Sequence, residues 1–116
     1  MEQLKNLKCE VCKAGAPVVT KEKVNALKLS IPEWEIIEED NINKLTRRFK
    51  FKDFKEALTF VNDIGNIAEK EGHHPVMVVE YNHVIVSWWS HKIKGLHRND
   101  FIMAAKTDSI KGREQV

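Results

Sequence analysis

Apolar and polar residues alternate along positions 45–51, which read LTRRFKF. Leu45, Phe49 and Phe51 fall on one side of a strand, and Arg47 is the one polar exception on that side. This period of two indicates a half-buried antiparallel strand. The run WEIIEE at 34–39 predicts a strand before it, and DNIN at 40–43 predicts the turn that joins the two.

The apolar period changes to that of a helix after Asp53, a residue type that caps helix N-termini. Gly72 is expected to end this helix as the residue just beyond it, and Pro75 prevents the helix from resuming. The apolar stripe that we expect to face the core consists of Phe54, Ala57, Leu58, Val61, Ile64 and Ala68.

Two runs rich in β-branched residues, 76–81 and 83–89, flank Asn82 and predict a hairpin. A short helix is expected from its N-cap Thr20 to about Ser30, and a last helix begins between His97 and Asp100. The predicted fold class is therefore α+β: a four-stranded antiparallel sheet with helices packed on one face, in the order α-β-β-α-β-β-α. Residues 1–19 are expected to form an irregular N-terminal arm, and residues 20–116 a single domain.

The composition is that of an ordinary globular chain of 116 residues, with 19 basic and 17 acidic residues interleaved along it. A net charge of +2 gives no basic face that would indicate nucleic acid or an anionic membrane as a partner. No apolar run approaches the ~18 residues that a membrane span needs, and the N-terminus lacks the apolar segment of a secretion signal. We therefore expect a cytoplasmic protein.

Both cysteines lie in one Cys-x-x-Cys motif, as Cys9 and Cys12. Such a motif can be half of a zinc site or a redox pair. Structural zinc normally takes four ligands, and the chain has no second cysteine pair. A thioredoxin-like site would be expected to follow a strand, and no strand pattern precedes the motif. We interpret the two residues as reduced thiols without a catalytic role, with metal binding or redox chemistry as the alternatives.

All five histidines lie between positions 73 and 97. Neutral imidazole both donates and accepts a hydrogen bond, and its ordinary pKa of ~6.5 suits proton transfer near neutral pH. His73 and His74 follow the long helix, and His91 follows the last strand. The start of the third strand and the end of the fourth are neighbours in the predicted hairpin, so the three can face one pocket.

Each histidine could instead be a solvated side chain or a favourable contact with a helix dipole. We adopt that interpretation for His83, beside the hairpin turn. His97 is expected near the N-cap of the last helix, with Asp100 as an acid in its first turn.

The spaced elements EKEGHHP, EYN and WWSHKIKGLHRNDF, together with PEW at 32–34, resemble the pterin-4a-carbinolamine dehydratases over roughly residues 20–108. The family pattern places an acid four residues before His-His-Pro, then an aromatic-Asn pair, a Ser/Thr-His, a Gly-Leu loop and an Asp. Met77 departs from the pattern, because many members carry a large aromatic there. His97 replaces a usual Ser or Thr, and the Cys-x-x-Cys arm resembles a bacterial branch of the family. The matching positions are Glu69, His73, His74, Pro75, Tyr81, Asn82, Ser90, His91, Gly95, Leu96 and Asp100.

The resemblance implies dehydration of 4a-hydroxytetrahydropterin to the quinonoid dihydropterin, which recycles the cofactor of an aromatic amino-acid hydroxylase, phenylalanine hydroxylase here. It implies His74 and His91 as acid and base, and His73 as the residue that binds and orients the pterin. Supporting or substrate-binding roles fall to Glu69, Pro75, Trp89, Ser90 and Asp100, with Trp89 as an apolar wall. No metal or organic cofactor is required, and a homodimer or homotetramer is expected from the family.

Two other functions compete with this hypothesis. One is a metal-dependent hydrolase that uses His73, His91 and an acid such as Asp100, although adjacent histidines on a strand point to opposite faces and chelate poorly. The other is a non-catalytic dimerisation or binding module on the same fold, since mammalian relatives also act as dimerisation cofactors of a homeodomain transcription factor. An exposed strand edge would suit self-association of that kind.

Overall fold

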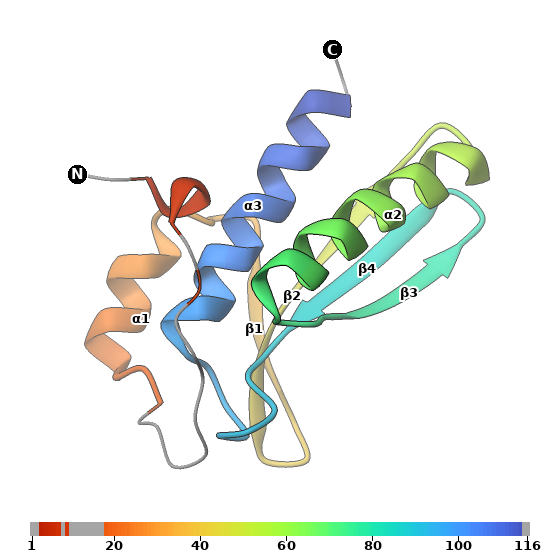
Figure 1. Cartoon of the computed structure of the whole chain (residues 1–116). Helices are drawn as coiled ribbons and strands as arrows, with labels where there is room; N and C mark the ends of the chain where they lie inside the picture. Colours follow the sequence, from red (N-terminus) through yellow and green to blue (C-terminus); the bar gives the residue numbers. More distant parts are fainter. Residues whose placement is uncertain (1–2, 8, 10–17, 115–116) are drawn as a thin grey trace.

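A computed structural model describes residues 3–7, 9 and 18–114 of the chain (Figure 1). After a short 3-10 helix, three α-helices and four strands follow in the order that the sequence predicts, so the α+β fold class is confirmed. The elements are η1 (Leu4–Asn6), α1 (Lys21–Lys28), β1 (Glu35–Glu39), β2 (Ile42–Lys50), α2 (Phe54–Glu71), β3 (Val76–Glu80), β4 (His83–Trp88) and α3 (Arg98–Glu114).

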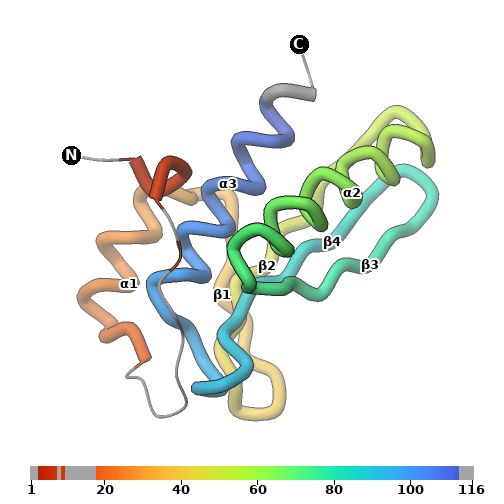
Figure 2. The backbone as a smooth tube through the Cα atoms, in the orientation of Figure 1, coloured from red at the N-terminus to blue at the C-terminus, as the bar shows by residue number. Residues whose placement is uncertain are grey.

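The four strands form one antiparallel sheet in the order β1-β2-β4-β3. Helices α2 and α3 lie on the same side of the sheet, as Figures 1 and 2 show, and no helix of the described residues covers the other face. In the β3–β4 hairpin Val76 pairs with Ser87, so the start of β3 lies beside the end of β4 as predicted. This adjacency brings the segment of His73 and His74 next to the segment of His91.

The β1–β2 turn is shorter than the sequence analysis predicts. Asp40 and Asn41 alone form it, with φ of 53° and 63°, and Ile42 already pairs with Glu39. Two consecutive residues with positive φ give the tight connection whose twist matches that of the flanking strands, and Asp and Asn tolerate this conformation. The expected turn at 40–43 was therefore too long by two strand residues.

Arg47, the polar residue on the apolar side of β2, contacts a half-buried acid on α3. Its Nη1 lies 2.7 Å from Oδ1 of Asp108, and the same oxygen accepts a hydrogen bond of 2.8 Å from Nε1 of Trp34. The guanidinium also lies over the ring of Phe49, at 4.5 Å from its centroid. Arg47 thus faces the core because α3 supplies its counter-charge there.

The apolar stripe of α2 differs from the predicted one. Ala57, Ile64 and Ala68 are buried as expected, but Phe54 and Leu58 remain 45% and 41% exposed, and the sequence analysis missed Phe60, which is fully buried. The ring of Phe60 packs against Phe49 and Phe51, at centroid distances of 4.8 and 4.9 Å. Phe49 of β2 and Phe51, just beyond its end, thus set Phe60 at the centre of the buried face of α2, and Phe54 and Leu58 lie at its margin.

The predicted helix ends agree with the structure. Asp53 accepts a hydrogen bond of 2.9 Å from the backbone N–H of Glu56, and Thr20 caps α1 by accepting one from Lys23. Within the N-terminal arm, η1 packs on α3, because Leu4 is buried there and Nζ of Lys106 donates to the carbonyl of Lys5. Cys12 lies outside the described residues.

Candidate functional site

Gly72 sets the direction in which the chain leaves α2. Its φ of 64° lies in the left-handed region, where glycine has no steric penalty. The N–H of Gly72 donates to the carbonyl of Glu69, and the N–H of His73 donates to that of Ala68, which together form a Schellman motif. His73 is consequently fixed as the second residue beyond the helix, with its side chain turned into the protein.

The imidazole of His73 is buried between the sheet and the start of α3. It is only 8% exposed, and its ring stacks on Trp88 with a centroid distance of 5.6 Å and an interplanar angle of 12°. Its Nε2 lies 2.6 Å from Oδ1 of Asp100. Two residues predicted from widely separated positions are thus in direct contact.

Asp100 is fully buried and uses both carboxylate oxygens. While Oδ1 takes His73, Oδ2 accepts 2.8 Å bonds from Oγ of Ser90 and from the backbone N–H of His97. In return Nδ1 of His97 accepts the N–H of Asn99 at 3.0 Å. This reciprocal arrangement is a helix cap, so the predicted roles of His97 and Asp100 at the start of α3 are confirmed.

Only one of the two ring nitrogens of His73 is engaged by the part of the chain that the structure describes. Nε2 donates to Asp100, whereas no described residue bonds Nδ1. Among the described residues no buried side-chain nitrogen or oxygen lacks a partner, so Nδ1 must reach the surface of the protein. The carboxylate therefore fixes the tautomer that leaves Nδ1 as an acceptor.

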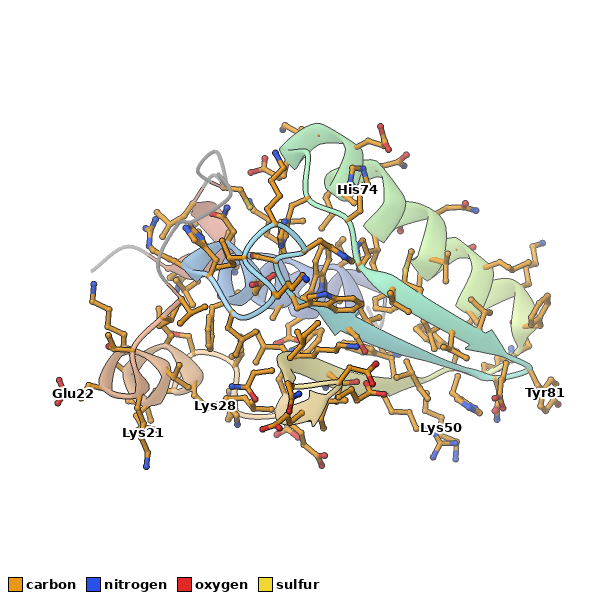
Figure 3. All side chains as sticks on the ribbon, turned by 90° about the horizontal axis from the view of Figure 1, so that it is seen from below. Lys21, Glu22, Lys28, Lys50, His74 and Tyr81 are labelled. Atoms are coloured by element: carbon orange, nitrogen blue, oxygen red, sulfur yellow. The ribbon has the colours of Figure 1, made fainter. Side chains whose placement is uncertain are left out.

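His74 lies on the surface, at the end of α2 (Figure 3). Its Nε2 is 3.0 Å from Oε1 of Glu69, and the two side chains are 60% and 81% exposed. The acid that the pattern places four residues before His73 thus contacts His74 instead. Pro75, half-buried, follows and leads directly into β3.

His91 begins a tight loop beyond β4. Ser90 and Gly95 close this loop with two backbone hydrogen bonds of 2.9 and 3.4 Å. The imidazole of His91 is exposed and packs on Trp89, with ring centroids 4.4 Å apart. Val18 lies close behind the loop, since a Cβ built on Gly95 would come within 2.9 Å of Cγ1 of Val18.

The register of the sheet relates the two exposed histidines. Val76 pairs with Ser87, so continuing the antiparallel alternation by two positions sets His74 opposite Trp89. Trp88 faces the helices, since its Nε1 donates to Thr107 of α3, so the next residue, Trp89, belongs to the open face of the sheet. His74 instead contacts Glu69 of α2, and His73 is buried. The structure thus divides the predicted residues into a buried group, His73, Ser90 and Asp100, and a surface group, in which Glu69, His74 and His91 are exposed and Trp89 is half-buried. That all three histidines line one pocket stays a prediction.

The sequence analysis missed Lys44 of β2, which is half-buried and contacts Trp89 of the surface group. Leu45 pairs with Trp88, so Lys44 is opposite Trp89, and its Nζ lies 4.2 Å from the centroid of that indole. The alternation of β2 placed Lys44 on the polar side of its strand. Only the pairing of β2 with β4 brings it to this site.

Cys9 contacts Glu71 at the end of α2 and Asn99, the residue before Asp100. Its backbone N–H donates to Oε1 of Glu71 at 2.8 Å, and its Sγ is 4.0 Å from the carbonyl oxygen of Asn99. Burial, followed by the negative charge of Glu71, raises the pKa of the Cys9 thiol to about 12. The thiol is therefore protonated at neutral pH. Catalysis or metal binding by a cysteine normally requires the thiolate.

The described residues contain no cluster of three or more His, Cys, Asp or Glu side chains placed to hold a metal ion. Both carboxylate oxygens of Asp100 are engaged, Oδ1 by His73 and Oδ2 by Ser90 and the N–H of His97. Nor does the described chain contain a helix long and apolar enough to cross a membrane.

The fold and the site define a class: a small α+β protein with a buried His–Asp pair between the end of one helix and the start of the next, and with two exposed histidines. The chain belongs to the Pterin 4 alpha carbinolamine dehydratase family, whose sequence profile matches residues 17–110. Two curated relatives carry the name "Putative pterin-4-alpha-carbinolamine dehydratase". That of Nitrosococcus oceani is 54% identical over 95% of this chain and 97% of its own length. That of Syntrophotalea carbinolica is 50% identical over 95% and 98%.

Two solved structures resemble the fold. One is described as a transcriptional coactivator/pterin dehydratase from Brucella melitensis, with a TM-score of 0.73, 33% identity, and coverage of 81% of this chain and 98% of that one. The other is a pterin dehydratase-like protein described as a RuBisCO assembly factor in the alpha-carboxysome. It has a TM-score of 0.59 at 20% identity, covering 69% of this chain and 90% of its own, and it supports the fold alone.

Proposed function

We propose that the protein dehydrates 4a-hydroxytetrahydropterin to the quinonoid dihydropterin by histidine acid–base catalysis. The observation that carries this proposal is the 2.6 Å contact between Nε2 of His73 and the fully buried Asp100, which leaves Nδ1 of His73 as an acceptor. Membership of the family and the names of the relatives from Nitrosococcus and Syntrophotalea support the same substrate.

The reaction breaks the bond between C4a and the hydroxyl oxygen and removes a proton from a ring nitrogen. The departing hydroxyl takes a proton and leaves as water, so the reaction needs one acid and one base and no net redox change. His74 and His91, both exposed on the side of Trp89, supply these two groups. Each positioned proton transfer is typically worth roughly 10²–10⁴-fold in rate.

His73 has a different role in this proposal. A ring fixed by Asp100 and by stacking on Trp88 cannot swing between donor and acceptor positions. It therefore binds and orients the pterin through Nδ1, while the more exposed histidines transfer protons. Ser90 supports this arrangement through its bond to Asp100, and Glu69 orients His74. None of these steps calls on a group from outside the chain.

The test is the decay of enzymatically generated 4a-hydroxytetrahydropterin, followed with wild type and His91→Ala, each with and without a chelator. Acceleration by wild type that survives the chelator and is largely lost in the variant supports the proposal. No acceleration by wild type would refute it. Acceleration that the chelator abolishes would favour the metal-dependent alternative.

We also propose that the product serves an aromatic amino-acid hydroxylase such as phenylalanine hydroxylase, in the cytoplasm. Such hydroxylases release the 4a-hydroxypterin, and the dehydrated pterin is the form that can be reduced again. The proposal predicts that adding this protein to a hydroxylase and pterin-reducing mixture raises the steady rate of tyrosine formation. An unchanged rate under conditions limited by pterin return would contradict it.

A second candidate function, a dimerisation or binding module, rests on one specific observation. β3 is an edge strand of the sheet, and Val76 and Val78 on it are 43% and 44% exposed. Such an edge can pair with another strand, and it suits a homodimer or homotetramer. Val78→Lys is the test, followed by light scattering and turnover. Loss of assembly with full turnover would separate the two roles, whereas unchanged assembly would exclude this edge.

A further inference from the structure

Lys44 lies on the open face of the sheet, beside Trp89. Its ammonium is 4.2 Å from the centroid of the Trp89 ring, and its side chain is only 14% exposed. Glu39, across the β1–β2 hairpin, approaches the ammonium at 3.7 Å. A lysine held between a carboxylate and an indole has lost much of the freedom of an ordinary surface lysine.

The Trp89 ring is also the surface on which His91 rests. The two ring centroids are 4.4 Å apart at an interplanar angle of 41°. Trp89 lies beyond the last residue of β4, so no strand ladder holds it. The position of its ring depends on side-chain contacts, and Lys44 makes one of them from the central strand β2.

We propose that Lys44 is a positioning residue for His91, acting through Trp89. This inference rests on the proposed function, in which His91 transfers a proton. The β1–β2 hairpin thereby becomes part of the site: Glu39 and Lys44 fix one end of a chain of contacts that finishes at the imidazole.

The physical reason is the orientation of a catalytic group on a loop. Cation–π attraction favours one position of the indole under the ammonium. The imidazole, at the start of a loop of four residues, then finds a fixed ring to pack against. Loss of alignment by about 1 Å can reduce turnover by roughly 10²-fold without changing which groups are present. Substrate affinity changes less, because His73 and Asp100 lie in the separate buried group.

The experiment compares Lys44→Met, which keeps the length of the side chain, with Lys44→Arg, which keeps the cation–π contact. The matched control is Lys50→Met, because Lys50 lies on the same strand and face but pairs with His83 at the far end of the sheet (Figure 3). Two readouts are taken on the full chain: kcat and KM for the pterin, and the ring-proton NMR shifts of His91, which the Trp89 ring current displaces.

We expect Lys44→Met to lower kcat by roughly 3- to 10-fold, with KM within about twofold, and to move the His91 resonances while those of His83 stay in place. Lys44→Arg restores both, and Lys50→Met changes neither. Unmoved His91 resonances in Lys44→Met would overturn the proposal, as would unchanged kcat or a loss confined to KM.

The NMR arm keeps this test separate from that of the proposed function. If wild type does not dehydrate the pterin, the proposed function fails, yet the His91 shifts still show whether Lys44 positions the ring. If Lys44→Met fails to fold, Lys44→Gln replaces it in the same measurements. Nuclear Overhauser contacts between Lys44 and Trp89 in wild type then test the proposed contact directly. Absence of those contacts in wild type would also overturn the proposal.

Discussion

The imidazole of His73 and the carboxylate of Asp100 join the end of α2 to the start of α3 through a contact of 2.6 Å. The two residues are 27 positions apart, and the hairpin of β3 and β4 lies between them. A buried carboxylate is stable only when it is paired and fully hydrogen-bonded. Ser90 and the N–H of His97 complete that requirement, so the same acid caps a helix and fixes a tautomer.

Asp100→Asn should impair both stability and turnover. An amide directed at His73 presents N–H where the carboxylate accepted, which forces Nε2 to become the acceptor and Nδ1 the donor. We expect turnover to fall at least ~10²-fold, and the free energy of unfolding to fall by about 1.5–3 kcal/mol because charge-assisted bonds are lost. Urea unfolding, pterin turnover and the ¹⁵N shifts of His73 measure these effects.

Asp63→Asn is the control for that prediction, because Asp63 is an acid of α2 that lies outside the site. This substitution should change neither turnover nor the free energy of unfolding. Ser90→Ala is a graded comparison: it removes one of the bonds to Oδ2 and keeps the charge. We expect it to cost about 1 kcal/mol and to leave the tautomer unchanged. Full turnover in Asp100→Asn would show that the contact has no functional role.

Two glycines of α2 should respond in opposite directions to the same substitution. A Cβ added at either Gly65 or Gly72 would meet no atom within 4 Å, so only the backbone differs. Gly65 is inside the helix, and Gly65→Ala should stabilise the protein by about 0.5–1 kcal/mol. Gly72 has φ of 64°, so Gly72→Ala should destabilise it by about 1–2 kcal/mol.

The functional part of this comparison concerns His73. Because the left-handed residue directs the chain into the buried group, Gly72→Ala should also lower turnover, and Gly72→Asn should recover part of the loss since Asn tolerates this conformation. Thermal unfolding and turnover are the measurements. Equal effects of alanine at positions 65 and 72 would contradict the assignment of Gly72 as the helix-ending residue.

Most of the fold could be predicted from local signals in the sequence. Gly72, Asp53 and the pairing of His97 with Asp100 are short-range devices, because each acts on backbone groups within five residues. The change from a period of two to a helical period placed the elements in the right order. The sequence also predicted that the His73–His74 segment lies beside the His91 segment, because the start of the first strand of a hairpin is next to the end of the second.

Long-range partners could not be predicted in the same way. Nothing near Arg47 in sequence indicates Asp108, 61 positions away, as its counter-charge. Phe60 is buried against the rings of Phe49 and Phe51, and Lys44 reaches Trp89 only through the β2–β4 register. In each case a tertiary contact decided which face of an element turned inward, and periodicity alone does not contain that information.

The exposed pair of Glu69 and His74 should affect activity more than stability. Both side chains are more than half exposed, so solvent screens the attraction and its loss should change unfolding by less than about 0.5 kcal/mol. Glu69→Ala should reduce turnover several-fold by freeing His74, and Glu69→Gln, which keeps an acceptor, should reduce it less. Added salt should narrow the difference between wild type and Glu69→Gln. A stability loss above about 1 kcal/mol would contradict this account.

Cys9 should be chemically inert in the folded protein. Burial and the nearby Glu71 raise its pKa to about 12, whereas alkylating agents react with the thiolate. In a Cys12→Ser variant, the remaining thiol should react with iodoacetamide at pH 8 roughly 10³-fold more slowly than an unperturbed cysteine. Urea should restore the ordinary rate. Mass spectrometry of timed samples measures this, and alkylation of the folded chain at the rate of the unfolded chain would contradict the buried position.

Asp108 should make the protein less stable as the pH rises above about 4. Burial raises the pKa of its carboxyl above the ordinary 3.8, although Trp34 and Arg47 act in the opposite direction. The folded state therefore binds this proton more tightly than the unfolded state. The stability that it contributes is complete below the unfolded pKa and is lost as pH rises through the folded pKa.

Asn does not titrate but can still accept from Trp34, so Asp108→Asn isolates this effect. The free energy of unfolding of wild type minus that of Asp108→Asn should fall with pH, by at most about 1.4 kcal/mol per pH unit. The fall begins near pH 4 and stops above the folded pKa. In an Arg47→Met background, where the opposing cation is absent, the same difference should continue to fall to higher pH. Urea titrations at intervals from pH 3.5 to 7 measure both curves. A difference that is flat, or that rises with pH, would mean that Arg47 outweighs burial and that the pKa of Asp108 is lowered instead.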